Sequence, residues 1–154
     1  MKSNDMKLGL IIFLLISALM IAGNSLAAEY LSVMNDGVNV RSGPSTKDDI
    51  IFEVFQDFPF MVIGREGEWV QVVDYEDAKG WVYASLLTKD KNVIVKVDIA
   101  NMRSAPDKDS QIIATAKKGV VFKPVDKNGN WLKVSYKNEV TGWIYNTLVF
   151  PSNP

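Results

Sequence analysis

Carboxylate and aromatic side chains are the residue types through which this chain could act chemically. The 154 residues include no cysteine and no histidine, so a cysteine nucleophile and an ordinary serine triad each lack a required member. A zinc site lacks its preferred ligands for the same reason. Two carboxylate pairs remain, Asp48–Asp49 and Glu76–Asp77, but they lie in polar, turn-like stretches, and a glycosidase site is not favoured. We predict no catalytic residues, no metal and no cofactor, and expect that the chain is not an enzyme.

Two tryptophans are the leading candidates for binding. Trp69 in the first half of the chain has a counterpart in Trp131, 62 residues later. Each tryptophan follows a glycine-containing turn, and the apolar residues that alternate with it leave it on the polar face of a strand. Aromatic walls with a few polar groups suit an extended peptide. We predict one ligand groove in each half of the chain; the alternative is that the rings merely cover the end of a small barrel.

Asparagine and arginine side chains form a second candidate group. Asn39 and Arg41 have counterparts in Asn101 and Arg103. They alternate with apolar residues, so their side chains face outward, where they can bind a peptide or a carboxylate. The structural alternative is that the asparagine caps a turn and the arginine fixes a loop.

These candidates occur twice because the chain contains an internal repeat. Residues 31–87 align with residues 93–149 at a constant shift of 62, without a gap, and 16 of the 57 positions are identical. The matching segments include "VNVRSGP" and "ANMRSAP", "GEW" and "GNW", and "GWVYASL" and "GWIYNTL". Self-similarity of this kind indicates two copies of one structural unit.

Each copy has the pattern of short β-strands. Apolar and polar residues alternate around Val38 and Val70, which is the period of a half-buried strand. Turn residues separate these stretches, and Asn128–Gly129 is a hairpin signal. We therefore predict an all-β fold of two tandem small barrels, in which Trp81 and Trp143 contribute to packing. Because small units bury little surface, and only residues 88–92 separate the copies, we expect the barrels to touch or to hold a restricted orientation.

The first 27 residues have the features of a secretory signal. Lys2 and Lys7 precede the apolar run Leu8–Ala22, and small residues at Ser25 and Ala27 fit a cleavage site. Such a segment is excluded from the fold; the alternative is an uncleaved membrane anchor. We expect an exported protein that is periplasmic, extracellular or associated with the cell wall. Membrane contact is expected only if the signal remains attached.

Charge is divided unequally between the two copies. Residues 29–90 contain five basic and twelve acidic residues, a net charge of −7, whereas residues 91–154 contain ten and five, a net charge of +5. This asymmetry has three interpretations. The basic half contacts an anionic surface, the halves attract each other, or both are simply solvated.

The repeated motifs resemble the bacterial SH3 domain family (SH3b, or SH3 type 3). The resemblance rests on "NVRSGPS", the Gly-x-Trp hairpin and the "GWVYASL" segment, in the same order, and implies a domain at residues 28–88 and another at 93–150. It also implies an extracytoplasmic barrel that binds peptidoglycan peptides or envelope proteins. A ligand-contacting tryptophan in the related eukaryotic pattern corresponds to Trp69 and Trp131. Tyr83 and Tyr145 take the place of a proline that lines the same groove in that pattern. The resemblance therefore implies one groove per domain, walled by Trp69 with Tyr83 and by Trp131 with Tyr145.

Two functions follow from these observations and the resemblance. The first is a non-catalytic protein that binds peptidoglycan peptides or cell-wall polymer through both aromatic grooves. The second is an adaptor or scaffold between envelope proteins. The export signal argues against nucleic acid as a partner.

Overall fold

The computed structural model describes residues 27–154, and all of its regular structure is β-strand or short 3-10 helix. Residues 1–26, and with them almost all of the predicted signal, lie outside the described part. Among the described residues, no helix is long and apolar enough to cross a membrane. The first copy comprises β1 (Tyr30–Val33), β2 (Val38–Arg41), β3 (Ile50–Val54), β4 (Pro59–Glu66), β5 (Trp69–Val73), β6 (Lys79–Tyr83), η1 (Ala84–Leu86) and β7 (Leu87–Thr88).

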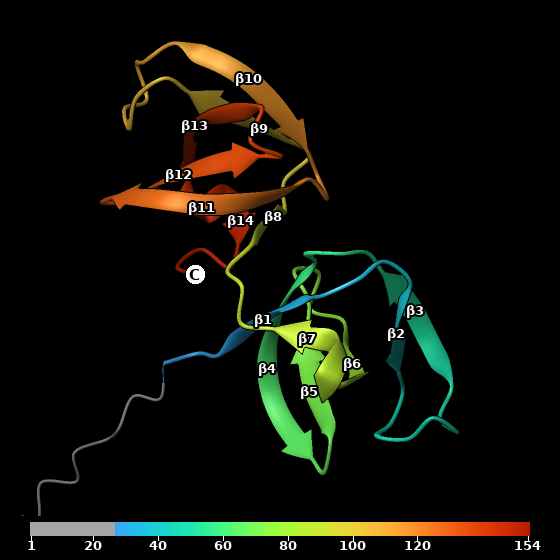
Figure 1. The fold of residues 1–154 in the computed structure, drawn as a ribbon. Helices are drawn as coiled ribbons and strands as arrows, with labels where there is room; N and C mark the ends of the chain where they lie inside the picture. Colours follow the sequence, from blue (N-terminus) through green and yellow to red (C-terminus); the bar gives the residue numbers. More distant parts are fainter. Residues whose placement is uncertain (1–26) are drawn as a thin grey trace, which may run out of the picture.

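The second copy repeats this series of elements. It comprises β8 (Val93–Val95), β9 (Ile99–Arg103), β10 (Ile112–Lys117), β11 (Val121–Asn128), β12 (Trp131–Tyr136), β13 (Val140–Tyr145), η2 (Asn146–Leu148) and β14 (Val149–Phe150). The two seven-stranded sheets have the same strand order, β3-β2-β6-β5-β4-β1-β7 and β10-β9-β13-β12-β11-β8-β14. Figure 1 shows them as two separate units joined by the segment between β7 and β8. The prediction of two tandem small all-β domains is confirmed.

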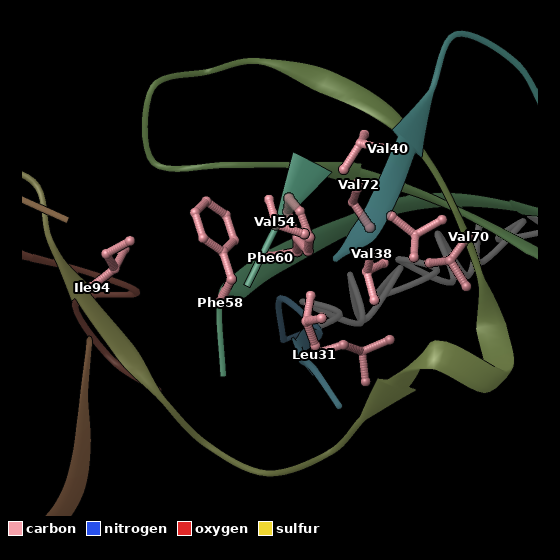
Figure 2. Packing of buried hydrophobic residues seen from close by; sticks show 11 residues of the cluster. Leu31, Val38, Val40, Val54, Phe58, Phe60, Val70, Val72 and Ile94 are labelled. Carbon is pink, nitrogen blue, oxygen red and sulfur yellow. The ribbon is translucent and has the colours of Figure 1, made fainter. Parts of the chain in front are cut away.

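Alternation along the strands places the apolar side chains in one core per copy. In β5, Val70 and Val72 are buried, whereas Trp69 and Gln71 on the other face are only partly buried. The first core also contains Phe58 and Phe60 (Figure 2). The matching residues of β12, Leu132 and Val134, lie in the second core, together with the other buried residues Val93, Val95, Ala100, Met102, Ala116, Phe122, Ile144 and Val149. Because buried and partly buried residues alternate, Trp69 lies on the outward face of β5, as predicted.

A close approach between strands requires glycine at the same place in each copy. A Cβ atom on Gly80 would lie 2.3 Å from Cγ1 of Val40 and 3.0 Å from the carbonyl oxygen of Arg41. A Cβ atom on Gly142 would lie 2.8 Å from Cδ1 of Ile113. These glycines let β6 and β13 lie against β2 and β9, which brings the tryptophan after each glycine beside an arginine.

The two copies touch, which is one of the two expected arrangements, and apolar residues contribute to the contact. Ile94, at the start of the second copy, belongs to the core of the first and lies on the side of that core marked by Phe58 (Figure 2). Phe150 also packs against the first core, and its ring meets that of Tyr30 edge to face at 5.9 Å between centroids. A single ion pair between described residues of the two copies, Lys118 with Glu76, accompanies this contact. Attraction between the oppositely charged halves stays one of the three interpretations of the charge distribution.

Candidate functional site

The predicted tryptophan–tyrosine pairs come together on the outward face of each copy. Trp69 in β5 lies opposite Tyr83 in β6, and Trp131 in β12 lies opposite Tyr145 in β13. The ring centroids are 5.4 Å apart at 77° in the first pair and 5.2 Å apart at 81° in the second. Edge-to-face contacts of this kind hold both rings in place. All four rings remain partly exposed, so each pair forms an aromatic surface open to solvent.

A tight hairpin places each tryptophan at the start of its strand. Gly67 and Gly129 both have φ of +55° and are the first of two loop residues, as in a type II′ turn. The predicted hairpin is confirmed, but its loop residues are Gly129 and Asn130 rather than Asn128 and Gly129. The backbone N–H of Ala84 donates to the carbonyl of Glu68 at 2.8 Å. This bond ties the end of β6 to the turn, and Asn146 does the same in the second copy.

The residue before each tryptophan makes the two aromatic pairs chemically different. The Tyr83 hydroxyl donates a hydrogen bond to the carboxylate of Glu68. That bond, reinforced by the negative charge of Glu68, raises the pKa of Tyr83 above its ordinary value. In the second copy, Nδ2 of Asn130 donates to the Tyr145 hydroxyl at 3.2 Å. The first aromatic pair therefore carries a negative charge at its edge, and the second carries a neutral amide.

The arginines predicted as ligand contacts hold loops in the structure. Arg41 donates through Nη1 to the carbonyl oxygens of Thr46 and Asp48, at 3.2 and 2.8 Å. Arg103 donates to the carbonyl of Ser110 at 2.7 Å. Both arginines therefore fix loops, which is the structural alternative to ligand binding. Part of each guanidinium is committed to this role.

The asparagines lie near the arginines without sharing their bonds. Asn39 and Asn101 are partly buried and lie on the same strand faces as Arg41 and Arg103. Their strand partners are Glu53 in the first copy and Thr115 in the second. A ligand role for these two side chains stays a prediction.

Trp81 and Trp143, which were predicted to contribute to packing, lie on the same outward strand faces as Tyr83 and Tyr145. Both rings are partly buried, and neither residue is part of a core cluster. Trp81 lies two residues before Tyr83 on the same face of β6 and opposite Gln71. Nζ of Lys133 lies 5.9 Å from the centroid of Trp143, a cation–π contact. The sequence did contain a signal for this placement. Each of these tryptophans lies two residues before a tyrosine, and alternate residues of a strand share a face.

Comparison with known proteins identifies the family. A model of the bacterial SH3 domain matches residues 34–89 and again residues 96–150. The chain belongs to the bacterial SH3 domain family. It carries two copies of the domain, and both aromatic pairs lie within the matched segments.

Similar proteins are much longer than this chain. A putative N-acetylmuramoyl-L-alanine amidase of Bacillus subtilis is 30% identical over 128 residues, which are 76% of this chain and 24% of the amidase. Among solved structures, two Trichomonas vaginalis proteins, NlpC2 and NlpC1, each match 80% of the chain at 17% identity with a TM-score of 0.34. The match covers 48% of NlpC2 and 46% of NlpC1. The chain thus spans about a quarter of its curated relative and under half of these structures.

Proposed function

We propose that this chain is a non-catalytic, exported protein that binds peptidoglycan peptides or cell-wall polymer through one aromatic groove on each domain. The observation that carries the proposal is the repeated, outward-facing pair of rings, Trp69 with Tyr83 and Trp131 with Tyr145. Membership of the bacterial SH3 family supports it, as does the similarity to a protein named as a putative N-acetylmuramoyl-L-alanine amidase. Two weak grooves on one chain gain avidity when both reach the same polymer.

The test is co-sedimentation of residues 28–154 with purified peptidoglycan sacculi at low and high salt. Both cores lie within this segment, so it retains its packing. The test variant is Trp69→Ala/Trp131→Ala, and the matched control is Phe55→Ala, because Phe55 is an exposed ring outside the grooves. Near-ultraviolet circular dichroism verifies that each variant is folded.

We expect the wild type and the control to pellet with sacculi at both salt concentrations, because aromatic contacts are weakly screened compared with exposed charges. We expect the double variant to remain in the supernatant. Pelleting that disappears at high salt, or that survives in the double variant, would contradict binding through the grooves. No pelleting at any salt would exclude this wall and favour the envelope adaptor, to be followed by crosslinking.

A further inference from the structure

The second domain has an apolar pocket that is not lined by Trp131 or Tyr145. It has a volume of about 310 Å³ and lies between β9, β10, β11 and the β12–β13 hairpin. The pocket walls are formed by Met102, Ala114, Val120, Phe122, Tyr136 and Val140. The pocket and the aromatic pair lie at opposite ends of β12. Tyr136 of the pocket and Trp131 of the pair are the last and first residues of that strand, roughly 17 Å apart at ~3.3 Å per residue.

The internal repeat explains how the pocket arises. Ala114 occupies the position of Phe52, and Val120 occupies the position of Phe58. In the first domain, Phe52 packs against the core and Phe58 is buried within it, 5.0 Å from Phe60 between ring centroids. The second domain therefore lacks two aromatic rings that fill the matching region of the first.

Larger residues at two other positions of the second domain replace only part of the volume of the two missing rings. Met102 replaces Val40, and Tyr136 replaces Asp74, yet the hollow of about 310 Å³ remains. Its lining is mostly apolar side chains. An apolar pocket of this kind favours an apolar guest over water, and the first domain supplies an example of the guest, a phenyl ring.

Two lysines lie at the pocket or beside one of its wall residues. Lys117 lines the pocket, and Nζ of Lys137 lies 5.3 Å from the ring centroid of Tyr136, a wall residue. Neither lysine takes part in the ion pairs found between described residues. The surrounding half of the chain has a net charge of +5. A partner with carboxylates next to its apolar side chain would complement these lysines.

We propose that this pocket binds one aromatic side chain from an extended segment of a protein partner, in which acidic residues flank the aromatic residue. The pocket supplies the apolar contact, and the lysines select the charge of the flanking residues. This site is separate from the wall-binding grooves, so each can fail without the other.

The test titrates isotopically labelled protein, residues 28–154, with blocked tripeptides and follows backbone amide shifts by NMR. The probes are glutamate–phenylalanine–glutamate, glutamate–alanine–glutamate and lysine–phenylalanine–lysine. We expect the first to shift the amides of Ala114, Val120 and Tyr136. We expect the alanine peptide to bind at least about tenfold more weakly, since burying a phenyl ring contributes that much or more. The lysine peptide is expected to bind more weakly than the first, and increasingly so at low salt.

Two variants locate the site. Ala114→Phe puts the first domain's ring into the pocket and is expected to weaken binding of the phenylalanine peptide at least about tenfold. Ile113→Phe is the matched control, because Ile113 is exposed and does not line the pocket, and it should bind as the wild type does. The converse variant, Phe52→Ala, should create new shifts in the first domain.

Three results would overturn the proposal. One is equal binding of the phenylalanine and alanine peptides by the wild type, a comparison that depends on no variant. Another is unchanged binding by folded Ala114→Phe. The last is movement of the pocket amides with protein concentration alone, which would make a second copy of this chain the occupant.

Discussion

The hydroxyl groups of Tyr83 and Tyr145 are one chemical difference between the two aromatic pairs. Tyr83 donates to the carboxylate of Glu68, whereas Tyr145 accepts from the amide of Asn130. The ring geometry is conserved between the pairs, so the difference is one of charge and not of shape. In the proposed binding role, ligand groups that carry positive charge should therefore favour the first aromatic pair.

The Tyr83–Glu68 hydrogen bond makes a testable difference at alkaline pH. Because this bond raises the pKa of Tyr83 in the folded state, its stabilising contribution is complete below the unfolded value of about 10. The contribution is lost as the pH rises through the folded pKa. Phenolate absorbance during a pH titration should show Tyr83 ionising at lower pH in Glu68→Gln than in the wild type. Asn130→Ala is the control at the matching position, and an unchanged titration of Tyr83 in Glu68→Gln would refute the assignment.

At the scale of single elements, the close antiparallel pairing of β6 with β2 depends on the missing side chain at Gly80. The nearest atoms to a Cβ there belong to the buried Val40 and to the backbone of Arg41, neither of which moves easily. The second domain keeps glycine at this position, Gly142. By contrast, Gly64 aligns with Asp126, and its nearest neighbour is the end of the flexible Gln71 side chain.

Alanine substitutions at these two glycines should have unequal effects. Gly80→Ala should lower the free energy of unfolding by about 1–3 kcal/mol, the usual cost of overpacking a core. Gly64→Ala should change it by less than about 0.5 kcal/mol, because the Gln71 side chain can move aside. Urea denaturation followed by tryptophan fluorescence measures both. Equal losses in the two variants would show that the close approach is not what requires glycine at residue 80.

Local sequence patterns predicted the strands well, but they did not predict the contacts between residues that are distant in the sequence. Alternation around Val70 and the repeat shift identified the strands and the outward face of Trp69, because burial in a sheet follows a period of two. The role of Arg41 stayed open, since a long side chain can reach a loop or a ligand. The assignment of Ile94 to the neighbouring domain's core had no local signal, because it depends on how two folded units meet.

At the scale of the whole molecule, the two domains share apolar packing. Ile94 is fully buried in the core of the first domain, whereas its neighbours in sequence, Val93 and Val95, belong to the second core. β8 therefore contributes to two cores at once. The first domain is stabilised by a residue outside its own repeat, and the domains are expected to unfold cooperatively.

Truncation of Ile94 should destabilise the first domain. Ile94→Ala should cost about 2–5 kcal/mol, as for other buried isoleucines, and hydrogen exchange should accelerate in β1 and β4 of the first domain. Ile112→Ala is the matched control, because Ile112 is 47% exposed, and its effect should stay within about 0.5 kcal/mol. If exchange in Ile94→Ala accelerates only in the second domain, the shared core is wrong.

The contact between Tyr30 and Phe150 also has a topological consequence. These residues stand near opposite ends of the described chain, yet their rings meet, and Nζ of Lys91 reaches the carbonyl oxygen of Pro154. Residues 27–30 and 150–154 thus lie beside each other, so a short added loop could join them. The tandem pair is therefore suited to circular permutation, with new ends opened in an exposed turn such as 67–68, and to insertion as a cassette into a surface loop of a host protein.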